Sequence, residues 1–305
     1  DALCEQGRNF CSKIWNAFRL IKGWTVDDNI QASDAAKLAV HWFESKQNEV
    51  AAEVADLFSK YRLSEALMAV YKLFWDEFSS WYLEMIKPAY GQGIDRTTYD
   101  ATLCFLDNLL HLLHPFMPFI TEELWQQMYE RNAEEGESLM VSALSMDTYV
   151  DTAFVAQFEV VKGVISNIRS IRLQKNIAQK EPLDLQVLGE NPVAEFNAVI
   201  QKMCNLSSIT VVESKAEGAS SFMVGTTEYA VPLGNMIDVE AEIARMEAEL
   251  KHKEGFLQGV LKKLSNEKFV NNAPAAVLEM ERKKQADAES IISSLKESIA
   301  ALKKA

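Results

Sequence analysis

A heptad repeat near the end of the sequence restricts the possible fold more than any other feature. Two interleaved sets of positions, each repeating every seventh residue, carry apolar side chains and one lysine: Met236, Ile243, Leu250, Leu257 and Leu264, and Val239, Met246, Lys253 and Val260. This spacing is typical of a coiled-coil seam. A break at 265–274 ends in a proline and precedes a second helix that reaches residue 305. The pattern therefore predicts an antiparallel coiled-coil hairpin, the arm, over residues 234–305.

The second helix of this hairpin has one apolar face. Its members are Ala288, Ile291, Leu295 and Leu302, flanked by Ile292 and Ile299. The two flanking isoleucines are the only hint of an outer apolar stripe, which a coiled-coil adaptor would need to bind a protein partner. Pairing of two arms in a homodimer is a further alternative, but the short break at 265–274 favours a hairpin within one chain. We therefore expect a monomer.

Residues 1–150 have the pattern of long helices separated by short breaks. Glycine and proline, 12 and 7 in the whole sequence, are scarce and clustered, which suits long helices. The predicted helices cover 2–23, 34–60, 64–87, 95–114 and 118–131. We expect Ser33 and Asp34 to cap the second. This region should form an antiparallel helix bundle with an aromatic-rich core.

Residues 151–233 have a different texture. A helix is predicted over 152–173 and a shorter one over 192–204. Alternating apolar and polar residues predict strands over 183–187, 208–213, 221–224 and 228–233. We expect a small α+β connector domain between the bundle and the arm. The fold class predicted for the whole chain is mainly α.

Composition excludes several broad classes of protein. Hydrophobic residues make up 48% and charged residues 25% of the 305 residues, which is ordinary for a globular protein. No apolar run approaches the roughly 18–20 residues of a membrane span. Four cysteines lie far apart with no C-x-x-C pair, so we expect a reduced, cytoplasmic setting. Because the first residue is aspartate and a helix is already under way, we expect a piece of a longer protein.

Charge is unevenly distributed along the sequence. The formal net charge is −13, and an acidic protein binds a polyanion only where positive charge is concentrated. Two places qualify: Arg8, Lys13, Arg19 and Lys22 on the first helix, and Lys262, Lys263, Lys268, Arg282, Lys283 and Lys284 near the turn of the arm. Phe10, Trp15 and Phe18 are interleaved with the first group and could stack on RNA bases. Two alternatives remain open. The basic residues could simply lie on a solvated helix surface, and the aromatic residues could belong to the core of the bundle.

No catalytic constellation is apparent in the sequence. His111 and His114 share a helix face, but apolar neighbours make them resemble residues at a helix end. There is no glycine-rich phosphate loop and no metal-binding motif. We therefore expect no catalytic residue and no metal in this chain, which alone should be inactive.

Several segments are similar to those of a known enzyme family. Residues 7–17 (GRNFCSKIWNA) resemble the helix that opens the anticodon-binding bundle of valyl-tRNA synthetases, and residues 113–125 (LHPFMPFITEELW) resemble a bundle segment that these enzymes share with the isoleucine, leucine and methionine enzymes. Residues 168–172 (IRSIR), followed by Pro182 and Leu183, resemble the connector of the valine enzyme. Residues 237–242 (IDVEAE) and 264–274 (LSNEKFVNNAP) are similar to the C-terminal coiled coil of the bacterial members. Ser12 and Phe18 depart from the common pattern.

The resemblance implies two contacts with valine tRNA. The bundle would bind the anticodon through Arg8, Asn9, Phe10, Lys13, Asn16 and Arg19. The arm would bind the outer corner of the tRNA through Lys262, Lys263, Arg282 and Lys283. For Arg169 and Arg172 in the connector we favour pairing with acidic neighbours over contacts with the tRNA backbone.

The resemblance also implies the activity of a parent enzyme. The H-x-G-H and K-M-S-K-S signatures of the class I catalytic core are absent, and the editing domain is absent too. The chain is thus expected to be the C-terminal, tRNA-binding part of a valine–tRNA ligase, a protein biosynthesis enzyme that attaches valine using ATP and magnesium. No cofactor, DNA or membrane partner is expected here. A coiled-coil adaptor and a tRNA-gripping module without amino-acid specificity remain the alternatives.

Overall fold

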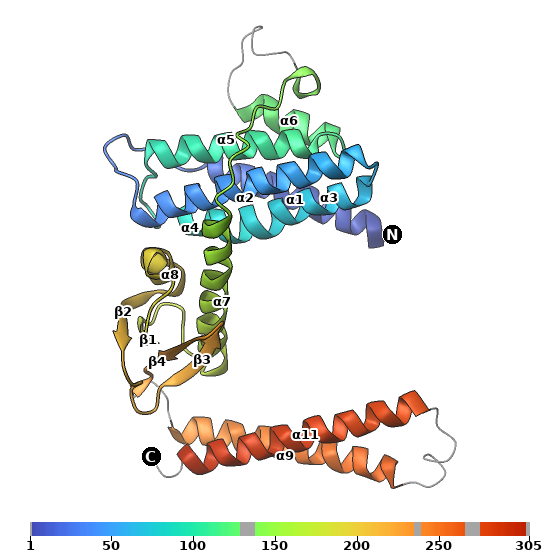
Figure 1. The fold of residues 1–305 in the computed structure, drawn as a ribbon, viewed down its shortest axis with the longest axis vertical. Helices are drawn as coiled ribbons and strands as arrows, with labels where there is room; N and C mark the ends of the chain where they lie inside the picture. The colour runs from blue at the N-terminus through green and yellow to red at the C-terminus, as the bar shows by residue number, and fades with distance from the viewer. Residues whose placement is uncertain (1, 129–137, 235–238, 266–274, 303–305) are drawn as a thin grey trace. The chain divides into compact units, whose positions relative to one another are not determined.

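The computed structural model describes residues 2–128, 138–234, 239–265 and 275–302. It divides into two compact units: residues 1–172 with 178–232, and residues 173–177 with 233–305. The first unit holds the helix bundle and the small sheet, and the second holds the arm (Figure 1). The mainly helical fold is confirmed, whereas the three domain boundaries predicted above stay a prediction.

The bundle contains the five predicted helices, one of which is divided. Its elements are α1 (Ala2–Lys22), α2 (Asp34–Ser59), α3 (Leu63–Lys72), a π-helical segment η1 (Leu73–Tyr82), α4 (Leu83–Ile86), α5 (Arg96–Leu113) and α6 (Pro118–Met128). Ser33 caps α2, since its hydroxyl accepts a hydrogen bond from the Ala36 amide at 3.2 Å. Asp95 caps α5 in the same way at Thr98, at 2.8 Å. Serine and aspartate are among the residue types preferred at the N-cap position of a helix.

Aromatic rings fill the centre of the bundle, as the sequence predicts. Phe43 of α2 lies 5.2 Å from Phe78, 5.0 Å from Tyr82 and 5.1 Å from Phe105, measured between ring centres. The Tyr82 hydroxyl and the Thr102 hydroxyl share a hydrogen bond of 2.8 Å in the same buried region. Burial raises the pKa of Tyr82 above its ordinary value. The core therefore joins α2, η1 and α5.

The connector consists of one long helix, one short helix and a four-stranded sheet. Its elements are α7 (Thr152–Gln174), β1 (Leu183–Leu188), α8 (Asn197–Cys204), β2 (Leu206–Val212), β3 (Ser220–Val224) and β4 (Thr227–Val231), with a short 3-10 turn at Ala194–Phe196. Another 3-10 turn, Leu139–Val141, precedes the connector. The strand order is β2-β1-β4-β3. β1 pairs with β2 in parallel, and the other pairings are antiparallel. All four strands were predicted within a few residues.

Aromatic contacts fix the connector to the bundle. Trp42 of α2 stacks on Phe158 of α7 with ring centres 4.1 Å apart. Phe196, just before α8, lies 4.7 Å from Phe154 and 5.8 Å from Phe158. Trp42, Phe158 and Phe196 are fully buried. Burial of these rings gives α7 a fixed position against the bundle.

The arm is a pair of helices, α9 (Val239–Leu264) and α11 (Ala275–Leu302). Lys296 pairs with Glu254 at 2.8 Å, and Lys263 lies 3.9 Å from Glu281. Because residues late in α9 face residues early in α11, the helices run antiparallel. Val260, Ala288, Ile292 and Ile299 are buried. The predicted position of Ile292 and Ile299 at the flank was wrong, since both side chains lie within the packed face, and the hint of an outer apolar stripe disappears with it. Coiled-coil supercoiling stays a prediction, and most of the break at 265–274 lies outside the described residues.

Candidate nucleic-acid interface

The predicted polar residues of α1 lie on its exposed side. Phe10, Ile14, Ala17, Phe18 and Ile21 are buried and form the opposite side of the helix. Arg8, Asn9, Asn16 and Arg19 are exposed and Lys13 is partly exposed. The 3.6-residue period of the helix therefore separates the residues that pack from those that are free to bind.

Most of these side chains have no strong partner in the chain. Among the described residues, Asn9, Asn16 and Arg19 form no side-chain hydrogen bond or ion pair. Arg8 lies 3.5 Å from Glu5, with both side chains largely exposed. The Lys13 ammonium lies 5.2 Å above the Trp75 ring. An exposed pair of this kind is weak, so the polar face of α1 is available for a ligand.

Phe10 is a core residue in this structure. Its ring centre lies 4.6 Å from Tyr71 and 5.9 Å from Phe74, and only 4% of the residue is exposed. Phe18 is equally buried. Neither ring can offer a free face to a base, so the expectation that one of them stacks on RNA gives way to the alternative interpretation as core.

A cavity that the sequence did not indicate lies where α1 ends. Two loops, one after α1 and one before α5, join through a short bridge between Val26 and Ile94. The Ile94 amide donates to the Thr25 carbonyl, and the Asp27 amide to the Ile94 carbonyl, each at 2.9 Å. The cavity measures about 400 Å³ and is lined by Gly23, Trp24, Thr25, Pro88, Ala89, Tyr90, Gly91, Gln92 and Gly93. We refer to it as the Tyr90 pocket.

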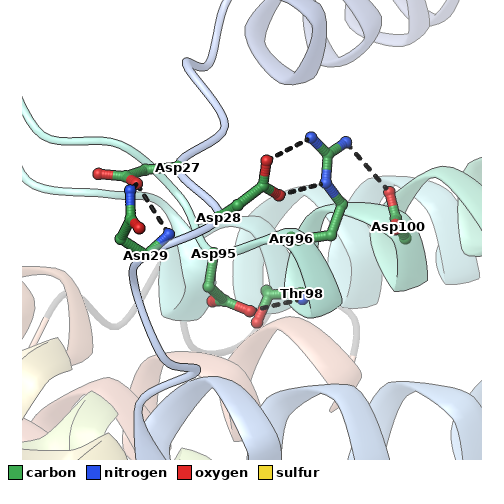
Figure 2. Close-up of polar contacts among 7 residues, drawn as sticks. All are labelled: Asp27, Asp28, Asn29, Asp95, Arg96, Thr98 and Asp100. Carbon is green, nitrogen blue, oxygen red and sulfur yellow. Dashed lines mark hydrogen bonds and ion pairs between the residues drawn. The ribbon is translucent and has the colours of Figure 1, made fainter.

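Polar contacts hold these loops in place (Figure 2). Arg96 Nε donates to Asp28 Oδ1 at 2.8 Å, which ties the start of α5 to the loop after α1. This hydrogen bond and the charge of Arg96 keep the pKa of the Asp28 carboxyl below its ordinary value. Asp27 Oδ1 accepts from the Asn29 amide at 2.9 Å. Gly93 suits the close approach, because a Cβ there would lie only 3.0 Å from the Thr25 carbonyl oxygen.

The Tyr90 pocket has the features of a base-binding site. The Tyr90 side chain is fully exposed and Trp24 is partly exposed. Aromatic rings free on one face are the usual platforms for unpaired RNA bases. The exposed Arg19 lies one helical turn before Gly23, whose amide donates to the Arg19 carbonyl at 3.0 Å. The sequence signal that could have identified the pocket is an aromatic residue between Pro88 and Gly91, in a turn.

The predicted residues of the arm are exposed but differ in their partners. Lys262, Lys263, Arg282 and Lys283 are all exposed. Glu281 is 5% exposed; it accepts from Lys284 at 2.8 Å and lies 3.9 Å from Lys263. Among the described residues, Lys262, Arg282 and Lys283 form no ion pair. These three cations are therefore freer than Lys263, while Lys268 lies outside the described residues.

Neither arginine of the connector pairs with an acidic side chain among the described residues, so the pairing that the sequence favoured for them was wrong. Arg172 is 1% exposed and donates to the carbonyls of Ala178 at 2.9 Å, Cys204 at 2.7 Å and Asn205 at 3.3 Å. It satisfies carbonyls where α8 ends, a position that favours a cation. The Arg169 guanidinium lies 5.5 Å above the Trp81 ring. Arg172 is thus structural, and Arg169 remains at the surface.

The histidines singled out above take part in local hydrogen bonds. His111 Nε2 lies 2.8 Å from the Ser142 hydroxyl, and His114 Nδ1 lies 2.8 Å from the Thr121 hydroxyl. No group of three or more potential metal ligands occurs in the part of the chain that the structure describes. No helix within the described ranges is long and apolar enough to cross a membrane.

Comparison with known proteins decides the family. A family described as the anticodon-binding domain of tRNA ligase matches residues 40–187, and one described as the valyl-tRNA synthetase tRNA binding arm matches residues 238–303. The chain is 99% identical over its whole length to a valine–tRNA ligase of Bacteroides thetaiotaomicron. The chain belongs to the valyl-tRNA synthetase family. Its bundle is therefore an anticodon-binding domain and its terminal helix pair a tRNA-binding arm.

More distant valyl-tRNA synthetases are similar over almost the same stretch. Identity to the valine–tRNA ligase of Phocaeicola vulgatus is 72% over 100% of this chain and 34% of that protein. For the enzyme of Enterococcus faecalis it is 35%, over 97% of this chain and 35% of that protein. The chain thus spans about a third of the length of these valyl-tRNA synthetases. The anticodon-binding match includes Tyr90 but begins after α1 and Trp24.

Proposed function

We propose that this chain binds valine tRNA at two separate places, so that a valine–tRNA ligase containing it can attach valine using ATP. The bundle would bind the anticodon and the arm would bind the outer corner of the tRNA. The observation that carries the proposal is the Tyr90 pocket, which lies at the end of α1, a helix whose polar face makes only weak contacts with the described residues. A monomeric, cytoplasmic protein with no DNA partner is part of the same proposal.

Anticodon binding follows from the chemistry of the pocket and of α1. Unpaired bases expose their faces and edges, and proteins read them by stacking and hydrogen bonds. Tyr90 and Trp24 supply the stacking surfaces. Asn9 and Asn16 have amides for base edges, while Arg8, Lys13 and Arg19 supply positive charge for phosphates and bases. Phe10 supports this surface from within the core.

Corner binding follows from the free cations of the arm. Lys262, Arg282 and Lys283 would contact phosphates, with Lys263 shared between the tRNA and Glu281. Contacts with phosphates position a nucleic acid without reading its sequence. The arm should therefore contribute affinity for every tRNA, and the bundle should contribute selectivity.

These contacts would serve a reaction that takes place elsewhere in the ligase. Binding energy gained far from the reacting groups can orient them and lower the activation barrier. ATP and magnesium would act in the parts of the enzyme that this chain does not span. A tRNA-gripping module without amino-acid specificity is the second candidate, favoured by the phosphate-directed charges of the arm.

Two tRNA transcripts test the proposal. One is valine tRNA and the other is identical except for a changed anticodon, each titrated with the chain across a salt series. We expect tighter binding of valine tRNA, and we expect Tyr90→Ala to reduce that preference. Tyr61→Ala is the control, since Tyr61 is also almost fully exposed but lies at the turn between α2 and α3.

The outcomes separate the candidates. Loss of preference in Tyr90→Ala, with the Tyr61→Ala control unchanged, would support anticodon recognition at the Tyr90 pocket. Equal binding of both transcripts by the unmodified chain would support the gripping module instead. Absence of binding at low salt would contradict both, and would direct attention to a protein partner of the arm.

A further inference from the structure

Two cations of α7 lie over aromatic rings where this helix meets the bundle. The Lys162 ammonium lies 5.3 Å from the ring centre of Trp42 and 5.9 Å from that of Trp81. Two turns further along, the Arg169 guanidinium carbon lies 5.5 Å from the ring centre of Trp81. Cations at these distances are attracted to the face of an indole ring. The two cations nevertheless differ in their other partners.

Lys162 is neutralised within the chain. Its ammonium donates to Glu77 Oε2 at 2.6 Å and to Glu159 Oε1 at 2.8 Å, and its side chain is only 12% exposed. Such a buried and doubly paired lysine holds α7 against η1. It has no remaining charge to offer a ligand.

Arg169 keeps its charge and its hydrogen-bond donors. Within the ranges that the structure describes, it forms no ion pair and no side-chain hydrogen bond. Its side chain is partly exposed, and so is Trp81 beneath it. Arg169 thus combines an aromatic contact with a charge that no described acidic side chain neutralises.

A guanidinium held near an indole ring is prepared for one kind of ligand. The ring attracts the positive charge, and the N–H donors of Arg169 form no hydrogen bond with described residues. Those donors form a rigid planar fork that matches two oxygens of a phosphate. Because the ring already restricts the side chain, less conformational entropy is lost on binding.

We propose that Arg169, held on Trp81, contacts a backbone phosphate of the bound tRNA at the junction of bundle and connector. The inference rests on the proposed tRNA-binding function and adds a third contact to it, apart from the Tyr90 pocket and the arm. As a phosphate contact it strengthens binding of any tRNA and does not read the anticodon. Trp81 is a positioning residue, which acts on the tRNA only through Arg169.

Salt dependence of binding is the measurement that distinguishes this role from a structural one. The chain and its Arg169→Ala variant are titrated with valine tRNA and with the changed-anticodon transcript from low to moderate salt. Loss of one phosphate contact should reduce the slope of log affinity against log salt by about 0.7–0.9. Affinity for both transcripts should fall by the same factor. Thermal unfolding of each variant is followed in parallel.

Three variants sharpen the result. Arg169→Lys keeps the positive charge but lacks the planar set of guanidinium donors. Its salt slope should therefore be close to that of the unmodified chain, while its affinity for tRNA should be weaker. Trp81→Phe keeps an aromatic face of lower cation affinity, and should weaken binding less than Arg169→Ala. Lys180→Ala is the control, because Lys180 is exposed in the same connector and forms no ion pair with described residues. It should leave the slope unchanged.

Each contrary result has a definite meaning. A lower melting temperature for Arg169→Ala with an unchanged salt slope would overturn the phosphate contact and leave a packing role. An equal change in Lys180→Ala would also overturn it, in favour of general charge attraction. Failure of the unmodified chain to bind either transcript would overturn the proposed function as well, so the two failures are distinguishable.

Discussion

Burial divides the candidate residues of this chain into those that hold the fold and those that can meet tRNA. Phe10 and Arg172 belong to the first group, and Tyr90, Arg19 and Arg169 to the second. Sequence alone could not separate them. Arg172 donates to the carbonyls of Cys204 and Asn205, more than thirty positions away. Residue spacing in helices and strands relates only residues a few positions apart, so it could not predict these partners. Tyr90 gains its pocket only because the loop after α1 pairs with the loop before α5.

Replacing Arg172 should destabilise the connector strongly. An Arg172→Leu variant removes the guanidinium donor from the carbonyls of Ala178, Cys204 and Asn205. The first and last of these also accept from backbone amides, those of Glu181 and Leu183. Since hydrogen bonds to charged groups contribute more than neutral ones, we expect the free energy of unfolding to fall by about 3 kcal/mol. Chemical denaturation followed by fluorescence measures it. A loss within the range of surface substitutions, about 0.5 kcal/mol, would show that these bonds are dispensable.

Phe10→Ala should affect folding and leave base recognition unchanged. Removing a buried phenylalanine costs about 3–5 kcal/mol through lost burial and the cavity that remains. At a temperature where the variant is still folded, its preference for the valine anticodon should equal that of the unmodified chain. A selective loss of that preference, with stability intact, would return Phe10 to the binding surface.

Individual elements were largely predictable where local chemistry decides their limits. Ser33 and Asp95 begin α2 and α5 as their side-chain oxygens allow, and α6 begins at Pro118, where proline suits a first turn. The π-helical segment was not predicted, because the uniform spacing of an α-helix was assumed for the whole helix over 64–87. In the structure the Leu83 amide donates to the Phe78 carbonyl, five residues back. Packing of Phe74, Phe78 and Tyr82 accompanies this wider turn.

The burial of two isoleucines in the arm differs from the sequence prediction. Ile292 and Ile299 are buried, although they were predicted to flank the apolar face, because neighbouring positions of a heptad pattern are hard to assign to one face from sequence alone. Glu281 is buried on the same helix, and the hydrogen bond from Lys284 keeps the pKa of its carboxyl below the ordinary value. A lowered carboxyl pKa contributes stability above the ordinary pKa and loses it as the pH falls below that range.

The lowered pKa of the Glu281 carboxyl predicts how the stability of a Glu281→Gln variant depends on pH. At neutral pH the variant should show faster hydrogen exchange in α9 and α11 than the unmodified chain. The difference should shrink as the pH falls through and below the ordinary carboxyl range, because protonation then removes the charge of native Glu281. Glu289→Gln is the control on the same helix, since Glu289 is exposed. A difference that stays constant with pH would show that Glu281 stabilises the arm by shape alone.

For the chain taken as a whole, we propose that the bundle provides selectivity and the arm provides affinity. The bundle is an anticodon-binding domain of the valyl-tRNA synthetase family, and the arm is a tRNA-binding arm. The net charge of residues 234–305 is zero, whereas that of residues 1–150 is −11. Overall charge therefore opposes tRNA binding by the bundle, which must rely on local contacts, while the arm presents cations with little repulsion.

Removal of the arm should weaken binding without changing selectivity. A chain ending at residue 233 lacks Lys262, Lys263, Arg282 and Lys283. We expect a shallower salt dependence and an equal loss of affinity for valine tRNA and for the changed-anticodon transcript, because phosphates carry no sequence information. A change in which transcript is preferred would contradict this division of roles.

The most direct test of two-site binding is a backbone-cleavage footprint of valine tRNA in complex with the chain. We expect protection at the anticodon loop and, separately, at the outer corner of the tRNA. Tyr90→Ala should reduce the first, and removal of residues 234–305 should abolish the second. Protection confined to the acceptor stem, or a footprint that neither change alters, would contradict two-site binding.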